Sequence, residues 1–223
     1  MADAEMLARG NRLKQAVREF FTKGHKSGNK LFDESNTPSV DYKDLVISTP
    51  RSVNRLTHCC ESQGHRIPRN ANTDYQMAEL LVKMPISDRS GNCYEMAVLS
   101  NYYALKREFI SRDLLYMMSI EAPGDHSCCI ISTVPIPGTG LSYATVQSFA
   151  ASNATRAYLV VDPWLNLVCS GNEYLRDGSG KLDKWSANGK RVSWRGSQGA
   201  GWYPPGGEYK DQFAVAPVTL SSF

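Results

Sequence analysis

The sequence predicts an α+β fold, because helical patterns fill its first half and strand patterns fill its second half. Its 223 residues, 42% of them hydrophobic, are enough for one globular domain with a substantial core. No apolar run approaches the roughly 18 residues that a membrane helix needs. The formal net charge is +3 without a basic block, so nucleic-acid binding is not expected as the main function.

The N-terminal part is expected to be an appendage to the main domain. Residues 4–23 have the apolar spacing of an amphipathic helix, and Gly24 is placed to end it. We expect this helix to pack on the main body; the alternative is a helix that contacts a membrane surface. Residues 24–73 are polar and interrupted by prolines, which predicts an irregular arm. The chain is thus divided into residues 1–73, the helix and arm, and residues 74–223, unless both form a single domain.

Two further helices are predicted before the strands begin. Asp74 is placed to cap a short helix that ends at Pro85. A turn-rich loop over residues 87–93 then opens the most helix-like stretch of the chain. This stretch runs from Cys93 to about Phe109, and we expect it to be the central buried helix.

After this helix the apolar pattern becomes that of strands. Buried strands are expected over residues 114–120, 126–134 and 158–161. Residues 141–151 fit a helix or a strand, and residues 177–208 show no clear period. The closing residues 213–217 predict a strand at the edge of a sheet, because Pro217 cannot donate to a central ladder.

The six cysteines are too few for a disulfide scaffold in a chain of this length. Four of them form two adjacent pairs, which rarely bridge each other, and the chain begins without the basic and apolar segments of a signal peptide. We therefore expect reduced thiols, five of which are packing residues: Cys59, Cys60, Cys128, Cys129 and Cys169. Cys128 is the rival nucleophile, because on a strand it shares a face with His126.

Three positions form a candidate nucleophile, base and orienting group. Cys93 lies where a loop enters a helix, and the free N–H groups and positive dipole end there favour a nucleophilic thiolate. His126 starts a strand and suits the role of base towards a thiol and acid towards a leaving amine. Asp162 ends another strand and would orient the imidazole. We expect adjacent strands to bring His126 and Asp162 together.

Neighbouring residues are expected to shape this site. Gly91 would leave room beside the sulfur for a substrate carbonyl, and Trp164 would exclude water. Glu95 and Asp125 are interpreted as capping or solvated groups. No cofactor or metal is predicted, because the crowded set His58-Cys59-Cys60 with His65 lacks the spacing of a zinc site.

The ordered motifs resemble those of papain-like and transglutaminase-like cysteine enzymes, in particular their bacterial toxin and type III effector branch. The motifs are Gly-Asn-Cys-x-Glu at residues 91–95, Asp-His at 125–126 and Val-Val-Asp-Pro-Trp at 160–164. The resemblance implies a papain-like or transglutaminase-like fold in which the cysteine helix packs on an antiparallel sheet carrying the histidine and the aspartate. It implies Cys93 as nucleophile, His126 as base and Asp162 as orienting residue.

Two positions depart from the papain-like pattern. Papain-like proteases place a glutamine six residues before the cysteine as an oxyanion donor, and Ser87 stands there in this chain. The donor would then be the Cys93 amide, the Asn92 side chain or the backbone near Asp88. Asp162 replaces the usual asparagine, as in transglutaminases and effector deamidases. The cysteine loop also resembles that of arylamine acetyltransferases.

The resemblance implies a thiol hydrolase that acts on a protein carboxamide or peptide bond. A glutamine deamidase is favoured, and a cysteine protease, a coenzyme A-dependent acyltransferase and a non-catalytic binding module on the same fold stay open. It also implies a virulence factor that a bacterium secretes into the host cytosol, with a host protein as its substrate and partner. Membrane contact by the N-terminal helix and the oligomeric state are left open.

Overall fold

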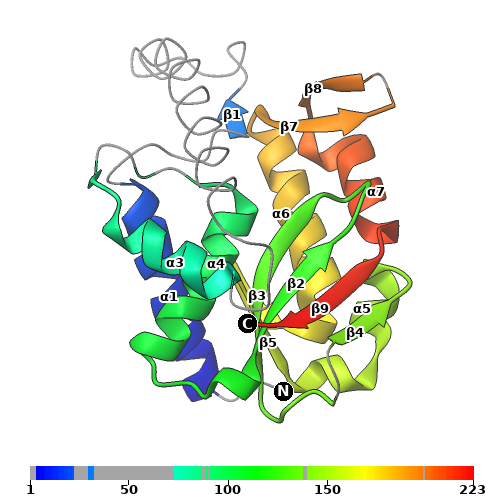
Figure 1. The fold of residues 1–223 in the computed structure, drawn as a ribbon. Helices are drawn as coiled ribbons and strands as arrows, with labels where there is room; N and C mark the ends of the chain where they lie inside the picture. Colours follow the sequence, from blue (N-terminus) through cyan, green and yellow to red (C-terminus); the bar gives the residue numbers. More distant parts are fainter. Residues whose placement is uncertain are drawn as a thin grey trace.

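The protein has an α+β architecture, as the sequence predicts (Figure 1). It is built on a six-stranded antiparallel sheet. The computed structural model describes residues 4–22, 30–32, 73–86, 89, 91–137, 140–197 and 199–223. In sheet order the strands are β4 (Gly140–Tyr143), β9 (Val218–Ser222), β2 (Leu115–Ile120), β3 (His126–Ser132), β5 (Tyr158–Asp162) and β6 (Leu167–Ser170). The central strands β2, β3 and β5 are almost wholly buried, so both faces of the sheet are covered.

Helices cover the two faces of this sheet (Figure 1). On one face lie α1 (Ala4–Thr22), α3 (Thr73–Lys83) and α4 (Cys93–Lys106). On the other lie α5 (Val146–Ala151), α6 (Tyr174–Ala187) and α7 (Lys210–Val215). Short 3-10 turns occupy Arg112–Leu114, Asn153–Ala157 and Gly171–Glu173, and a helical segment at Pro205–Tyr209 that is kinked at Gly207 leads into α7.

A second, three-stranded sheet joins a short part of the N-terminal arm to the C-terminal half. Its order is β1 (Lys30–Phe32), β7 (Lys190–Gly196) and β8 (Gly199–Tyr203), all antiparallel. The remainder of the arm predicted over residues 24–73 lies outside the described residues.

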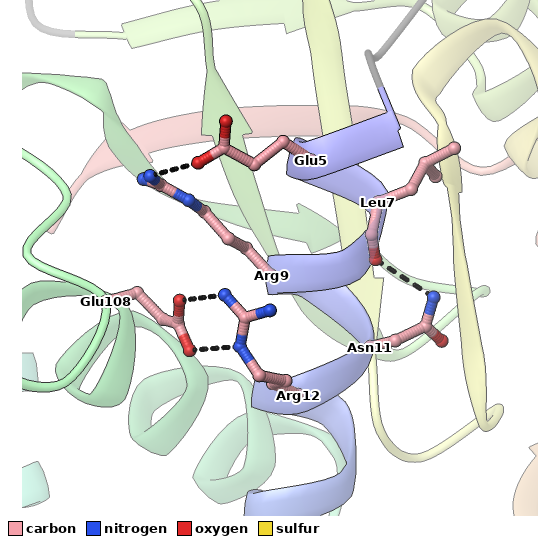
Figure 2. Close-up of polar contacts among 6 residues, drawn as sticks. All are labelled: Glu5, Leu7, Arg9, Asn11, Arg12 and Glu108. Carbon is pink, nitrogen blue, oxygen red and sulfur yellow. Dashed lines mark hydrogen bonds and ion pairs between the residues drawn. The ribbon is translucent and has the colours of Figure 1, made fainter.

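The N-terminal helix packs into the main body, which is the first of the two expected alternatives. Leu13, Val17 and Phe21 are fully or almost fully buried. Gly10 lets the helix approach the sheet, because a Cβ there would lie 2.7 Å from Val168 Cγ1. At its outer side Arg12 forms a two-bond ion pair of 2.7 and 3.0 Å with Glu108, just beyond α4 (Figure 2).

The apolar side of α1 is therefore used within the protein. Among the described residues, no helix combines the length and the apolar character needed to cross a membrane.

The helix α6 was not predicted, because its composition hides its period. Its buried residues are Tyr174, Gly178, Leu182 and Trp185, which recur at helical spacing. Gly178 stands where a larger apolar residue would normally mark the stripe. Its missing side chain brings the helix against Leu165 and Phe213, whose atoms would lie 3.6 and 3.7 Å from a Cβ at this position.

The prediction of a C-terminal edge strand at residues 213–217 was wrong in two respects. Phe213 belongs to α7, and the strand begins only at Val218. This strand, β9, is interior, since it pairs with β2 on one side and β4 on the other. Pro217 comes directly before the ladder, where its missing N–H costs no strand hydrogen bond.

Smaller differences concern element ends. Asp74 lies inside the first turn of α3 rather than before it, and its carboxylate accepts a 2.6 Å hydrogen bond from the Tyr94 hydroxyl of α4. The ambiguous residues 141–151 contain both a strand end and a helix. The strand β6 was not predicted.

Candidate active site

His126 and Asp162 meet at one end of neighbouring strands. Cys129 of β3 pairs with Val161 of β5, so Cys128 stands opposite Asp162, and His126 lies two residues earlier on the same face. His126 and Asp162 are therefore diagonal neighbours on paired strands, and side chains in such positions can reach each other. His126 Nε2 and Asp162 Oδ2 are 2.7 Å apart, and both side chains are almost completely buried.

The Asp162 carboxylate is satisfied by three partners. Besides His126, the backbone N–H of Leu165 donates to Oδ1 at 2.8 Å and the Tyr174 hydroxyl donates to Oδ2 at 2.9 Å. Burial would raise the pKa of Asp162, but the positive charge of His126 and these hydrogen bonds outweigh it and lower the pKa below its ordinary value. Asp162 is therefore held ionised in one orientation.

The His126 imidazole is held by charge and by aromatic rings. Burial would lower the pKa of His126, but Asp162 and, more weakly, Cys93 raise it to about 10. The Trp164 ring lies 5.0 Å from the imidazole between centroids, and the Phe213 ring lies 6.1 Å away. Trp164 is 2% exposed, and its ring covers the imidazole.

The other nitrogen of the imidazole, Nδ1, is not bound by Asp162. His126 Nδ1 is buried and makes no hydrogen bond of acceptable geometry within the described part of the chain. Cys93, the first residue of α4, is half-buried and close enough to affect the charge on His126. Because Nε2 is bound by Asp162, proton exchange between Cys93 and His126 would use Nδ1.

The loop before Cys93 is fixed by capping of α4. Asn92 is the N-cap residue, with extended backbone angles of φ −95° and ψ −161°. Its backbone N–H donates to Glu95 Oε2 at 2.8 Å. Glu95 is thus a capping residue, as predicted. Asp88, named as a further oxyanion donor, and Ser87 lie outside the described residues.

Gly91 serves a different purpose from the one expected. A Cβ on Gly91 would lie 2.6 Å from Phe21 Cε1 and 2.9 Å from Glu95 Cβ, and the residue is buried. The space beside this backbone is therefore filled by a ring of α1 and is not available to a substrate. Glycine is needed here because Phe21 packs directly on the cysteine loop.

Gly91→Ala is expected to lower the free energy of unfolding by about 1–3 kcal/mol, because the new methyl group overlaps the Phe21 ring. Urea unfolding measures the effect. The matched control is Gly180→Ala in α6, where a Cβ meets no atom within 4 Å, and it should gain about 0.5–1 kcal/mol. Adding Phe21→Leu to Gly91→Ala should recover part of the loss, and strict additivity of the two changes would contradict the overlap.

The N-terminal helix also touches the opposite side of the site. Arg18 Nη1 donates to the Pro163 carbonyl at 3.0 Å, next to Trp164. Burial lowers the pKa of Arg18 below its ordinary value. Through Phe21 and Arg18, α1 supports both the cysteine loop and the turn after Asp162.

Three other cysteines are packing residues, as predicted. Cys128, Cys129 and Cys169 are buried, and burial raises the pKa of each thiol. Cys129 donates to Asn101 Oδ1 of α4 at 3.2 Å, on the face opposite Asp162. Cys59 and Cys60, and with them the disfavoured zinc set, lie outside the described residues. The ranges that are described hold no group of three or more potential metal ligands.

Two tyrosines near the site were missed from the sequence. Tyr174 follows Asp162 by 12 residues and donates to it. Tyr209 is almost fully buried, and its pKa is raised by burial and by the charges of Cys93, Asp125 and Asp162. Neither tyrosine stands in a recognisable motif. The helical spacing of Tyr174 with the buried residues of α6 was the available signal for the first.

Comparisons with family models, with curated proteins and with solved structures gave no match for this chain.

Proposed function

We propose that this protein is a thiol hydrolase with Cys93 as nucleophile, His126 as base and Asp162 as orienting residue. The observation that carries the proposal is the buried His126–Asp162 pair, whose remaining nitrogen, Nδ1, makes no hydrogen bond to any described residue, with the half-buried Cys93 nearby. A buried, oriented imidazole beside a thiol at a helix N-terminus is the arrangement that nucleophilic catalysis needs.

The chemistry follows from these positions. Because the raised pKa of His126 keeps the imidazole protonated near neutral pH, Nδ1 holds the proton that the Cys93 sulfur gives up, and this sulfur forms a bond to the substrate carbonyl carbon. The tetrahedral intermediate then collapses, the C–N bond breaks, and the amine or ammonia leaves with the proton from Nδ1. Water attacks the resulting thioester with His126 again accepting a proton, which releases a carboxylate and restores the thiol.

A papain-like or transglutaminase-like fold is part of this proposal. In support, the cysteine-bearing helix α4 packs on β3 of an antiparallel sheet, and the histidine and aspartate lie on paired strands. These are the relations that the motif resemblance implies. Asp162 as third member, together with Ser87 in place of an upstream glutamine, favours deamidation of a protein glutamine over peptide cleavage.

The resemblance also supports the setting of the reaction. We infer a bacterial effector that is secreted and acts on a protein in the host cytosol. Three reduced, buried cysteines besides Cys93 are compatible with work in a reducing compartment.

Wild-type protein is expected to convert glutamine to glutamate in one or a few proteins of a host cytosolic extract, whereas Cys93→Ala should convert none. Quantitative mass spectrometry of the extract would measure this change and would also detect new N-termini from cleavage. The matched control is Cys169→Ala, which changes a buried packing cysteine and should keep the activity. If neither modification depends on Cys93, the hydrolase proposal is wrong.

A further inference from the structure

Tyr209 reaches the site from the C-terminal part of the chain. It ends the segment Pro205–Tyr209, which is kinked at Gly207 and leads directly into α7. Its ring packs edge-on against Trp194, with centroids 5.5 Å apart. Trp194 Nε1 in turn donates to the Pro123 carbonyl at 2.7 Å, in the turn that leads into His126. The tyrosine is thus attached to the start of the histidine strand.

A second contact fixes the same turn relative to the imidazole. Phe213 follows Tyr209 by four residues, one helical turn later, and its ring lies 6.1 Å from that of His126. Tyr209 is thus packed on Trp194, and the helix that follows it places Phe213 beside the imidazole.

The Tyr209 hydroxyl has no hydrogen-bond partner within the described residues. The residue is only 4% exposed, yet its hydroxyl makes no hydrogen bond among the described residues. Cys93, Asp125 and Asp162 are all close enough to influence its titration. Burial and these negative charges raise the pKa of Tyr209 well above its ordinary value, so the phenol keeps its proton and can donate.

We propose that Tyr209 supplies the hydrogen-bond donor to the substrate oxygen when Cys93 attacks the carbonyl. This role rests on the proposed hydrolase function and answers its open requirement for an oxyanion donor in place of the glutamine that Ser87 replaces. As the C–S bond forms, the carbonyl oxygen gains a negative charge, which the neutral hydroxyl stabilises without giving up its proton. A hydroxyl that is not bonded to another described residue breaks no hydrogen bond to those residues when it binds that oxygen.

The test compares two reactions of the same thiol. Acylation of Cys93 by p-nitrophenyl acetate passes through a tetrahedral intermediate and releases p-nitrophenolate, whereas alkylation by iodoacetamide is a direct displacement without an oxyanion. Tyr209→Phe should lower the acylation rate about 10- to 100-fold and leave the alkylation rate within about twofold of wild type. The full-length chain is used, and thermal melting verifies that each variant is folded.

The chain offers a close control in Tyr203. Its ring packs on the same Trp194, with centroids 5.6 Å apart and the same interplanar angle of 76°. Tyr203→Phe therefore removes a hydroxyl from the other tyrosine that packs on this tryptophan. This variant should acylate at the wild-type rate.

The outcomes separate the two proposals. If Tyr209→Phe acylates as fast as wild type, or if acylation and alkylation fall together, Tyr209 is not an oxyanion donor, while a Cys93-dependent acylation still supports the hydrolase. If wild-type protein shows no acylation that Cys93→Ala abolishes, the hydrolase proposal fails and the role of Tyr209 fails with it.

Discussion

Replacing Asp162 with alanine is expected to lower the free energy of unfolding by about 3–5 kcal/mol at pH 6. The change leaves the buried imidazolium of His126 without its counter-charge. It also removes the acceptor for the Leu165 N–H and the Tyr174 hydroxyl. Urea unfolding at pH 6 measures the loss. Asp183→Ala is the matched control, because Asp183 is half-exposed in its 2.7 Å ion pair with Lys210 and should contribute less than about 1 kcal/mol.

The pH dependence of this loss has a definite sign. The pKa of His126 is raised to about 10 in the folded protein, so its stabilising contribution is fully present below about pH 6.5 and is lost as the pH rises towards 10. The pKa of Asp162 is lowered, so its contribution is present above about pH 4 and is lost as the pH falls below that value. The difference between wild type and Asp162→Ala should therefore be largest between about pH 4 and 6.5 and smaller at pH 10. An equal difference at pH 6 and pH 10 would contradict a charged pair.

Replacing His126 with glutamine is expected to lower Cys93-dependent acylation by p-nitrophenyl acetate about 10²- to 10⁴-fold. The glutamine amide can donate to the Asp162 carboxylate and so keep a hydrogen bond of the buried pair, but it cannot accept the thiol proton. The variant should therefore stay folded while its acylation rate falls. Thermal melting measures the stability separately.

Iodoacetamide alkylation gives an independent readout of the same variant. In wild type the alkylation rate of Cys93 should depend on the protonation state of His126. In His126→Gln the rate should follow the pH profile of an isolated thiol. Identical pH profiles for the two proteins would show that His126 does not act on Cys93. The control Cys129→Ala, on the other face of β3, should leave the profile unchanged.

Local patterns were sufficient for most elements of the core. The spacing of apolar residues indicated α1, α4 and the central strands, because each of these buries a continuous face. The same reasoning failed for α6, where glycine occupies a buried position, and for β9, whose interior place depends on pairing with two strands distant in sequence. The spacing of apolar residues indicates which side of a segment is buried. It does not indicate which other helices or strands that segment contacts.

The candidate site divides in the same way. The residue types, the loop-to-helix position of Cys93 and the strand-end positions of His126 and Asp162 are all readable along the chain, because they depend on local chemistry and element boundaries. That the imidazole of His126 meets the carboxylate of Asp162 follows from the register of β3 against β5.

The remaining parts of the site depend on packing between segments far apart in the chain. Phe21 occupies the space beside Gly91, and Tyr174 and Tyr209 approach the pair from the helices on the other face of the sheet. These contacts form only when the helices are seated on the assembled sheet, so no local pattern of residues can specify them. The sequence thus names the candidate thiol, base and orienting carboxylate, while the assembled fold selects the side chains that hold and surround them.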